Sequence, residues 1–374
     1  MSVIEGRSVL VVGGGIGGLT AAIALRRHGA LVDVIERDPT WSVYGVGIIQ
    51  QSNVVRAMRD LDLLDDYLDA GFGYDHLDIF LPTGAKVARI QTPSLAEGYP
   101  SNVGIGRRAL HKVLGDRTIA AGAIVRLGVT ATRIEDDGEG VDVTFSDGSA
   151  GRYDLVVGAD GLYSETRRSI FPDAPAPMFT GQAVWRYNFQ RPSDVTGMHV
   201  YEGAIGVGLV PLSDELMYMY VTTPEPGNPR YPRETLAEAL RGKIAGLPAA
   251  IASLGEQIVD NDAVVYRPLE WLLLEGPWHK GRVVLLGDAV HATTPHLGQG
   301  AGMAIEDAIV LADELGRADD REAGLVAYRD RRFDRCAYIV RQSLAICMGQ
   351  IGKGPPMDNG KATQEMFAVI SAPI

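Results

Sequence analysis

Residues 287–302, GDAVHATTPHLGQGAG, combine side chains that can do chemistry with a flexible backbone. They contain the acid Asp288, the imidazoles of His291 and His296, and four glycines. An apolar run at 283–286 precedes them and a helical pattern follows. An acid at such a position is often only a turn residue or a helix N-cap, but the glycines after it would be costly for mere capping. The pattern therefore favours a ligand-binding loop.

A second glycine-rich turn lies near the start of the chain. Residues 8–12 form an apolar run, and Gly13, Gly15 and Gly18 follow in the spacing G-x-G-x-x-G at the start of a helical pattern. In this motif the first glycine permits the tight turn, the second lets a pyrophosphate approach, and the third lets the helix pack closely on the strand. Glu36 ends the next predicted strand, where an acid can accept ribose hydroxyls. Strand, helix and acid together predict a dinucleotide site, for NAD or for FAD.

The middle of the chain offers a third strand followed by polar residues. A predicted hairpin over 141–153 leads into a buried strand at 155–157, which ends in Gly-Ala-Asp-Gly at 158–161. An Asp-Gly pair after a strand is often only a turn. It can also place the backbone and the carboxylate of Asp160 beside a bound cofactor.

Residues 178–223 show a different pattern, in which aromatic and β-branched residues alternate as in an antiparallel sheet. The aromatic residues of 184–189 fall on one face and Arg186 on the other, and Tyr218 shares a face with Tyr220. Arg186 and Tyr218 are therefore candidates to contact a substrate. Each also has an ordinary interpretation, as a surface charge or a packed sheet aromatic.

The elements that position these residues alternate between strand and helix at both ends of the chain. A helical stretch at 233–254 follows the antiparallel segment, and the α/β pattern resumes at residue 281. The helix that begins near Ala301 is predicted to bury one apolar face, formed by Ala304, Ala308, Leu311 and Leu315. The segment after residue 351, GKGPPMDNGK, is interpreted as a loop or a loosely held end.

Composition limits the classes of function. The 374 residues are 46% hydrophobic, enough for a large core and about two domains, and the net charge of −12 disfavours a nucleic-acid groove or an anionic membrane as main partner. Cys336 and Cys347 lack metal-site spacing, so we expect two reduced thiols in a cytoplasmic protein and no metal. The uncharged stretch 8–25 is interrupted by glycines, so neither a membrane span nor a signal peptide is expected.

Three motifs in this order make the chain resemble the single-component FAD-dependent aromatic hydroxylases, related in fold to p-hydroxybenzoate hydroxylase. They are GGGIGG followed by Glu36, then GADGLYSETR, then GDAVHATTPHLGQGAG. The resemblance implies a three-layer, discontinuous FAD-binding α/β domain over 1–74, 101–172 and 278–345. It also implies an inserted, mostly antiparallel substrate domain over 75–100 and 173–277, and a helical or loop tail over 346–374.

The resemblance also implies the cofactor and its contacts. FAD is expected to bind non-covalently, with Asp288 beside the ribityl chain or pyrophosphate and the glycines near 300 against the flavin. Arg107 matches the arginine that family members direct at the flavin. Together, the motifs and the resemblance assign to FAD binding Gly13, Gly15, Gly18, Glu36, Arg37, Gly47, Arg107, Asp160, Asp288, Gly298, Gly300, Ala301 and Gly302.

The chemistry implied is hydroxylation of an aromatic or heteroaromatic, phenolic or acidic small molecule with NAD(P)H and O2, through a flavin C4a-hydroperoxide. The catalytic candidates are His296, Tyr218 and Arg186. His296 is either a base or acid-binding residue at the substrate or a residue behind it, and both interpretations stay open. The chain is expected to be a monomer or a homodimer. The alternatives are a halogenase or isoprenoid reductase of the same fold, and a non-catalytic protein that binds FAD or a prenyl lipid.

Overall fold

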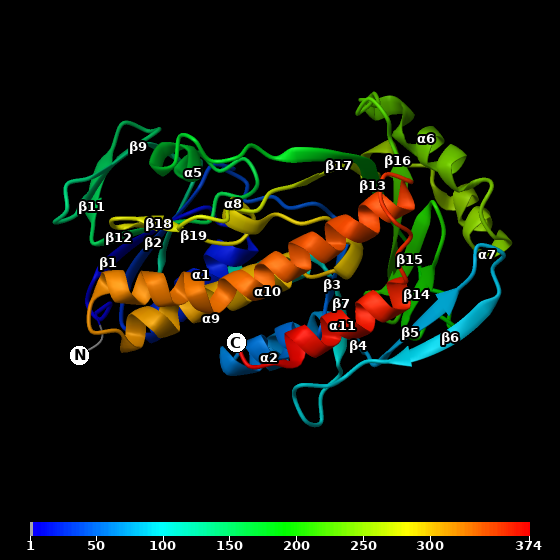
Figure 1. Ribbon diagram of the computed structural model, residues 1–374, viewed down its shortest axis with the longest axis horizontal. Coiled ribbons are helices and arrows are strands. Elements are labelled where there is room, and N and C mark those ends of the chain that lie inside the picture. Colours follow the sequence, from blue (N-terminus) through cyan, green and yellow to red (C-terminus); the bar gives the residue numbers. More distant parts are fainter. Residues whose placement is uncertain (1–2) are drawn as a thin grey trace.

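The computed structural model of the chain describes residues 3–374 and places a parallel α/β sheet at one end and an antiparallel sheet at the other (Figure 1). The α/β sheet has the strand order β18-β19-β12-β1-β2-β8, and all neighbours are parallel except β18 and β19. Its strands are β1 (Ser8–Val12), β2 (Leu31–Glu36), β8 (Ile124–Leu127), β12 (Leu155–Gly158), β18 (His279–Lys280) and β19 (Val283–Leu285). The ends of β1, β12 and β19 therefore bring all three sequence motifs to one edge of one sheet.

Two small antiparallel sheets flank this sheet. One consists of β9 (Ala131–Asp136), β10 (Val141–Phe145) and β11 (Ala150–Tyr153) and contains the predicted hairpin. The other consists of β3 (Gly47–Gln50), β7 (Asn102–Gly106) and β4 (Gly71–Tyr74) and lies between the two large sheets in Figure 1.

The second large sheet has the order β17-β13-β16-β15-β14-β5-β6 and is antiparallel except between β14 and β5. Its strands are β5 (His76–Phe80), β6 (Lys86–Gln91), β13 (Met178–Gln190), β14 (Met198–Tyr201), β15 (Gly206–Pro211), β16 (Leu216–Pro224) and β17 (Val265–Trp271). The face bearing Trp185, Tyr187 and Phe189 packs on a separate apolar core, as the alternation predicted. The opposite face, which bears Arg186, is left for the interior of the molecule.

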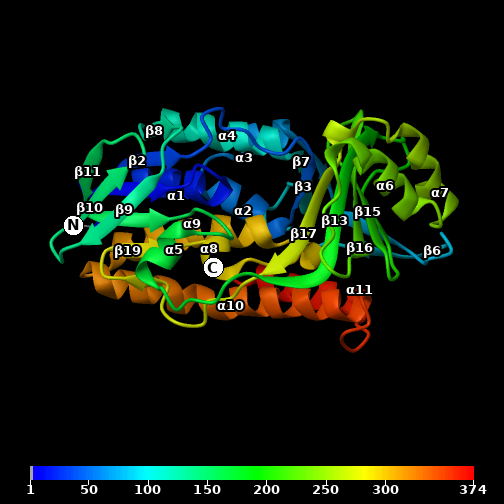
Figure 2. The same ribbon diagram turned by 90° about the horizontal axis from the view of Figure 1, so that it is seen from above.

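Helices cover the sheets and join the two ends. They are α1 (Ile16–Arg27), α2 (Ser52–Asp60), α3 (Leu64–Asp69), α4 (Arg107–Ala120), α5 (Glu165–Ile170), α6 (Leu236–Ile244), α7 (Ala249–Ala252), α8 (Asp288–His291), α9 (Gly300–Arg317), α10 (Arg321–Gln350) and α11 (Asn359–Ser371). Both views show α10 running from the α/β sheet to the antiparallel sheet (Figure 2). None of the helices over residues 3–374 has the length and apolar character needed to cross a bilayer.

The predicted fold class is confirmed. The stretch predicted to be helical at 233–254 is helical but divided: α6 ends at Ile244, and α7 begins after Pro248, which has no N–H to donate within a continuous helix. The segment after residue 351 is a loop up to Asp358, as predicted, but it is not a loosely held end, since it leads into α11. Asp358 caps this helix by accepting from the Lys361 N–H, and Met366 and Phe367 are buried.

Candidate active site

The turn between β1 and α1 leaves room for a ligand at one glycine only. Gly13 has φ +111°, and a Cβ there would lie 2.4 Å from the Ala159 carbonyl oxygen. A Cβ on Gly18 would lie 1.9 Å from the Gly13 oxygen, so these two glycines serve the packing of the chain itself. A Cβ on Gly15 would have no neighbour within 4 Å among the described residues. The space in front of Gly15 is therefore open to a molecule other than the chain.

Glu36 is held against this turn. Its carboxylate accepts the N–H groups of Gly14 and Asp38, each at 2.9 Å. The Gly14 carbonyl in turn accepts from Trp41 Nε1 and His111 Nε2, each also at 2.9 Å. These hydrogen bonds hold the turn on both sides without the help of a ligand. The neighbouring Arg37 is exposed.

Asp160 has a structural task in this arrangement. Its carboxylate accepts the Thr166 N–H and hydroxyl, each at 2.9 Å, and the Ser164 hydroxyl at 2.5 Å. These bonds hold the first turn of α5, so the turn interpretation of the Asp-Gly pair applies to the Asp160 side chain. Arg167 joins this motif to the third one by donating to the Ala289 carbonyl at 2.8 Å.

Asp288 follows the left-handed Gly287 and opens the short helix α8. Its side chain is exposed toward the space between the sheets, yet many protein atoms surround it at longer range, and this enclosure raises its pKa. The positive charges of His291 and Arg107 oppose that rise. Asp288 and Arg107, 181 residues apart in sequence, therefore face the same interior space.

The start of α9 presents free backbone donors to this space. The 3₁₀ turn Pro295–Leu297 ends at Gly298, which has φ +68°, and the 18-residue helix α9 then begins at Gly300. No side chain of the described residues caps α9, and its first turn holds no acid. The N–H groups of Gly300, Ala301 and Gly302 and the positive end of the helix are thus available to an anion.

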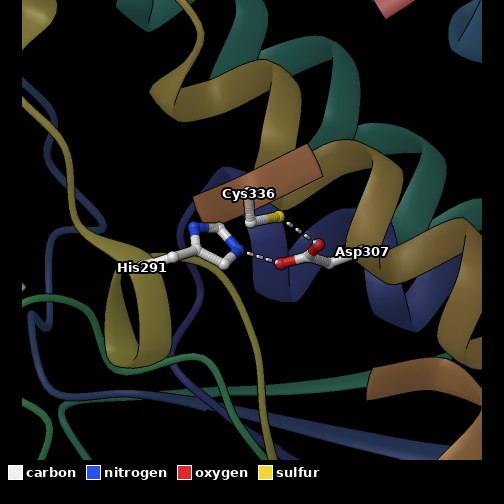
Figure 3. Close-up of side chains that lie close together, drawn as sticks. All are labelled: His291, Asp307 and Cys336. Atoms are coloured by element: carbon white, nitrogen blue, oxygen red, sulfur yellow. Dashed lines mark hydrogen bonds and ion pairs between the residues drawn. The ribbon is translucent and has the colours of Figure 1, made fainter. Parts of the chain in front are cut away.

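Behind this loop lies a buried set of paired charges. His291 Nε2 contacts Asp307 Oδ2 at 2.5 Å, and the other oxygen of Asp307 accepts from Arg332 Nε at 2.8 Å. Arg332 also bonds Glu306 at 2.7 Å. Figure 3 shows Cys336 beside Asp307, so three possible metal ligands meet here, but the Arg332 cation already occupies the carboxylate. We assign this cluster the structural role of holding α9 and α10 together.

Burial and charge act against each other in this cluster. Burial alone would lower the pKa of His291, but the Asp307 carboxylate raises it well above its usual value. Burial would raise the pKa of Asp307, and the charges of His291 and Arg332 instead hold it at about 2. All three groups are consequently charged near neutral pH and paired with one another.

Two neighbouring arginines, Arg186 on β13 and Arg107 at the start of α4, have no such partners. Arg186 stands directly opposite Tyr220 in the sheet, and Tyr218 lies on the same face of β16. Burial and the nearby Arg107 lower the pKa of Arg186 to about 10, which still leaves it charged at neutral pH. Neither guanidinium has a hydrogen-bond or ion-pair partner within residues 3–374, and the carboxylate of Asp288 favours the charge of Arg107 only from beyond ion-pair distance.

Tyr218 is packed rather than free. It is 3% exposed, and a Cβ on Gly47 would lie 2.2 Å from its ring, so Gly47 is small because Tyr218 presses on it. Burial raises the pKa of Tyr218 to about 12 although Arg186 and Arg107 favour the charged form. The phenol is therefore neutral near pH 7 and suits hydrogen bonding better than proton abstraction.

His296 lines a pocket between the antiparallel sheet, the loop before α9 and the C-terminal helices. Its Nδ1 bonds the Thr294 hydroxyl at 3.0 Å, and its Nε2 bonds Gln350 Oε1 at 3.1 Å. Since the amide oxygen must accept, Nε2 carries the proton and Nδ1 accepts from Thr294. Burial lowers the pKa of His296 to about 4. The ring is neutral near pH 7 and both nitrogens are occupied, so this arrangement offers no free base.

The pocket also contains residues that sequence reasoning missed. They come from β3 and the residue after it, from the antiparallel sheet and the residue after β14, and from α10 and α11. They are Ile49, Gln51, Leu77, Met198, Val200, Tyr201, Glu202, Gly206, Tyr220, Thr222, Ile346, Gln350, Asn359, Thr363 and Met366. The G-V-G spacing of Gly206 and Gly208 was a usable signal, because two glycines on one face of a strand mark a close approach. Nothing local signals Gln350, which lies 54 positions after His296.

These features fit a dinucleotide whose phosphates meet the helix starts. The open space at Gly15, the uncapped start of α9 and the acid Asp288 supply room, donors and an acceptor at one edge of the sheet. The chain matches the family model described as FAD binding domain over residues 7–343.

Relatives of known name cover nearly the whole chain. Aurachin C monooxygenase/isomerase of Stigmatella aurantiaca is 33% identical over 359 residues, which are 93% of this chain and 90% of that protein. The FAD-dependent urate hydroxylase of Mycolicibacterium vanbaalenii is 31% identical over 366 residues, 93% of this chain and 89% of that protein. The structure of Klebsiella pneumoniae HpxO complexed with FAD and uric acid superposes with a TM-score of 0.84 at 27% identity, covering 98% and 92% of the two chains. This chain therefore belongs to the FAD binding domain family and is an FAD-dependent monooxygenase.

Proposed function

We propose that the enzyme uses NAD(P)H and O2 to hydroxylate an aromatic or heteroaromatic ring that carries an anionic group. The observation that carries the proposal is Arg186, an enclosed guanidinium without a hydrogen-bond or ion-pair partner among residues 3–374, which stands near a second such cation, Arg107, assigned above to the flavin. Enclosed cations are normally paired, because an unpaired charge in a poorly solvated place is costly. A bound carboxylate or ring oxyanion supplies the missing partner.

FAD is held by the residues of the three motifs in this proposal. Gly15 and the start of α1 would hold the pyrophosphate, Glu36 would accept from the ribose hydroxyls, and Asp288 would contact the ribityl chain or the pyrophosphate. The backbone donors at Gly300 and Ala301 would be directed at the flavin. The open space at Gly15 and the uncapped start of α9 support these assignments.

The bound flavin, reduced by NAD(P)H, supplies the activation of oxygen for transfer to the ring. The chain itself orients the substrate. Arg186 fixes the anionic group by charge and hydrogen bonds, and the neutral Tyr218 supports the ring from the same sheet face. The apolar residues of the pocket keep water away from the reacting centre.

His296 orients rather than deprotonates the substrate in this proposal. Its two nitrogens are bonded to Thr294 and Gln350, and its pKa near 4 leaves little basicity for a phenolic proton. The variant His296→Gln tests this role by the pH profile of product formed per NAD(P)H oxidised. An unshifted profile with a modest loss of coupling supports orientation, whereas a loss of about 10²-fold or more with a shifted profile identifies a base.

A screen for stimulated NAD(P)H oxidation tests the function itself. The purified yellow protein is assayed with phenolic, pyridine and other heteroaromatic acids, each beside its neutral carboxamide. The acids are expected to stimulate NAD(P)H and O2 consumption and to yield hydroxylated products, and the amides much less. Equal stimulation by acids and amides would remove the anionic group from the proposal, and no NAD(P)H oxidation at all would favour a binding protein.

A further inference from the structure

Gln350, the last residue of α10, is held so that only its oxygen is used. Its Oε1 lies 3.0 Å from Gln182 Nε2, 3.1 Å from His296 Nε2 and 3.4 Å from Thr222 Oγ1. All three neighbours can donate a hydrogen bond to an amide oxygen. The amide oxygen of Gln350 is thus the acceptor at which the sheet, the loop before α9 and α10 meet.

The orientation of the Gln350 amide is fixed by a chain of donors that begins at a thiol. Cys347 Sγ lies 3.2 Å from Gln182 Oε1, and a thiol is a better donor than acceptor toward an amide. That contact fixes Gln182 with its NH2 toward Gln350, and the Gln182 NH2 then requires the oxygen of Gln350 on its side. The NH2 of Gln350 consequently points the other way.

The Gln350 NH2 faces the pocket without an acceptor. Within the described part of the chain no acceptor bonds Gln350 Nε2, and this atom does not belong to the fully buried unpaired groups. The Gln350 NH2 is accessible from the pocket because Gly206, which lines the same pocket, has no side chain. A Cβ on residue 206 would lie 3.1 Å from Gln350 Nε2. Arg186 lies close to this pocket. Tyr220 lines the pocket and is the residue of β16 that stands directly opposite Arg186 of β13.

The geometry points to Gln350 as a specificity-determining residue whose NH2 donates to an acceptor atom, a ring nitrogen or carbonyl oxygen, of the substrate. This inference rests on the proposed function, in which the Arg186 side binds the anionic group. It adds a second polar contact with the substrate. The preferred substrates are therefore heteroaromatic acids rather than carbocyclic ones, because a site built to donate a hydrogen bond discriminates against a ligand without an acceptor.

Matched acids test this preference in the FAD-loaded protein. Picolinate, nicotinate and isonicotinate differ from benzoate only by a ring nitrogen, which is placed at the three ring positions relative to the carboxylate. Binding is measured by the perturbation of the flavin absorption spectrum. At least one pyridine acid is expected to bind about two- to ten-fold more tightly than benzoate, the range for one net hydrogen bond.

Three variants assign the preference to Gln350. Gln350→Met removes the donors and Gly206→Ala shields them, so both are expected to bring the pyridine acids and benzoate to equal affinity. Gln182→Met is the matched control, because it removes one of the three donors to the Gln350 oxygen while His296 and Thr222 still hold that oxygen on its side, and it is expected to keep the preference. The flavin content and absorption maximum of each variant show that the protein is folded and loaded.

The outcomes separate this inference from the proposed function. If all four acids bind and Gln350→Met and Gly206→Ala leave the affinity ratios unchanged, or if benzoate equals every pyridine acid in the native protein, the role of Gln350 is refuted and the proposed function stands. If none of the four acids perturbs the flavin of the native protein, the binding of aromatic acids itself fails and the inference fails with it.

Discussion

The interior holds two groups of charged side chains that differ in their pairing. Behind the loop before α9, Asp307 and Arg332 are fully buried and paired. In front of it, Arg186 and Arg107 are enclosed yet have no partner among residues 3–374. Pairing offsets the free-energy cost of burying a charge. The first group is therefore complete within the protein, whereas the second group needs an anionic partner from a ligand. Charge alone does not mark a functional site, whereas a missing partner does.

The backbone shows the same difference at helix starts. Asp320 caps α10 by accepting from the Ala323 N–H at 2.8 Å, and Asp358 caps α11. The starts of α1 and α9 have no side-chain cap among the residues described and no acid in the first turn. The caps close the starts of α10 and α11, whereas α1 and α9, which face the proposed FAD, keep their donors free, as α2 and α4 also do.

The largest expected effect comes from filling the open space at one of these helix starts. Gly15→Val places a side chain where no chain atom lies within 4 Å, and Gly15 has φ −83°, which valine tolerates. The protein is expected to fold but to be purified almost colourless, with flavin content reduced more than tenfold. Gly242→Val, on an exposed position of α6, is the control and is expected to stay yellow. Full flavin content in Gly15→Val would show that the phosphate site is elsewhere.

Breaking the paired group is expected to cost stability instead of binding. Arg332→Met leaves Asp307 and Glu306 without their buried cation, and such a loss destabilises a protein by about 3–5 kcal/mol. Urea unfolding of the flavin-loaded protein measures the effect. Arg152→Met, which removes the exposed pairs with Asp137 and Asp142, is the control and is expected to cost less than about 1 kcal/mol. Equal effects of both variants would contradict the structural assignment of the cluster.

His296 lets the pH dependence of stability be predicted with its sign. Burial lowers its pKa to about 4, against about 6.5 in the unfolded chain, so between these values the unfolded state binds a proton that the folded state refuses. The stability linked to this ring is present above pH 6.5 and lost as the pH falls toward 4, up to about 3 kcal/mol. Unfolding free energies of the native protein and His296→Gln at several pH values are compared. If the unfolding free energies of the two proteins changed equally with pH, the His296 ring would be protonated as easily in the folded protein as in water.

The smallest change in the free energy of unfolding is expected at Arg186, which has no hydrogen-bond or ion-pair partner among residues 3–374. Arg186→Met removes an unpaired charge and its repulsion with Arg107, so the free energy of unfolding is expected to stay the same or rise slightly. Affinity for an aromatic acid is expected to fall about 10- to 100-fold, the range for a hydrogen bond to a charged group. Flavin perturbation by the acid, beside the same measurement with its carboxamide, shows whether the loss depends on the anion. Unchanged affinity together with lower stability would make Arg186 a structural residue.

Much of this molecule follows from its sequence, because the deciding information is local. The glycine turn at Gly13, the strand before it and Glu36 lie within 29 residues, and side-chain alternation placed Arg186 and Trp185 on opposite faces of β13. The division of the helical stretch at 233–254 is local as well, since α6 ends at Ile244 and Pro248 stands directly before α7.

Only the tertiary structure decided which polar groups have partners. Arg186 meets Arg107 across 79 positions, and Gln350 meets His296 across 54, so no periodicity or motif spacing connects them. The sequence by itself determined the types of charged and amide side chains and the elements that carry them. Whether two of them pair depends on the distance between elements that are far apart in the chain. In the folded protein Asp307 and Arg332 come close enough to pair, whereas Arg186 and the NH2 of Gln350 find no partner among residues 3–374.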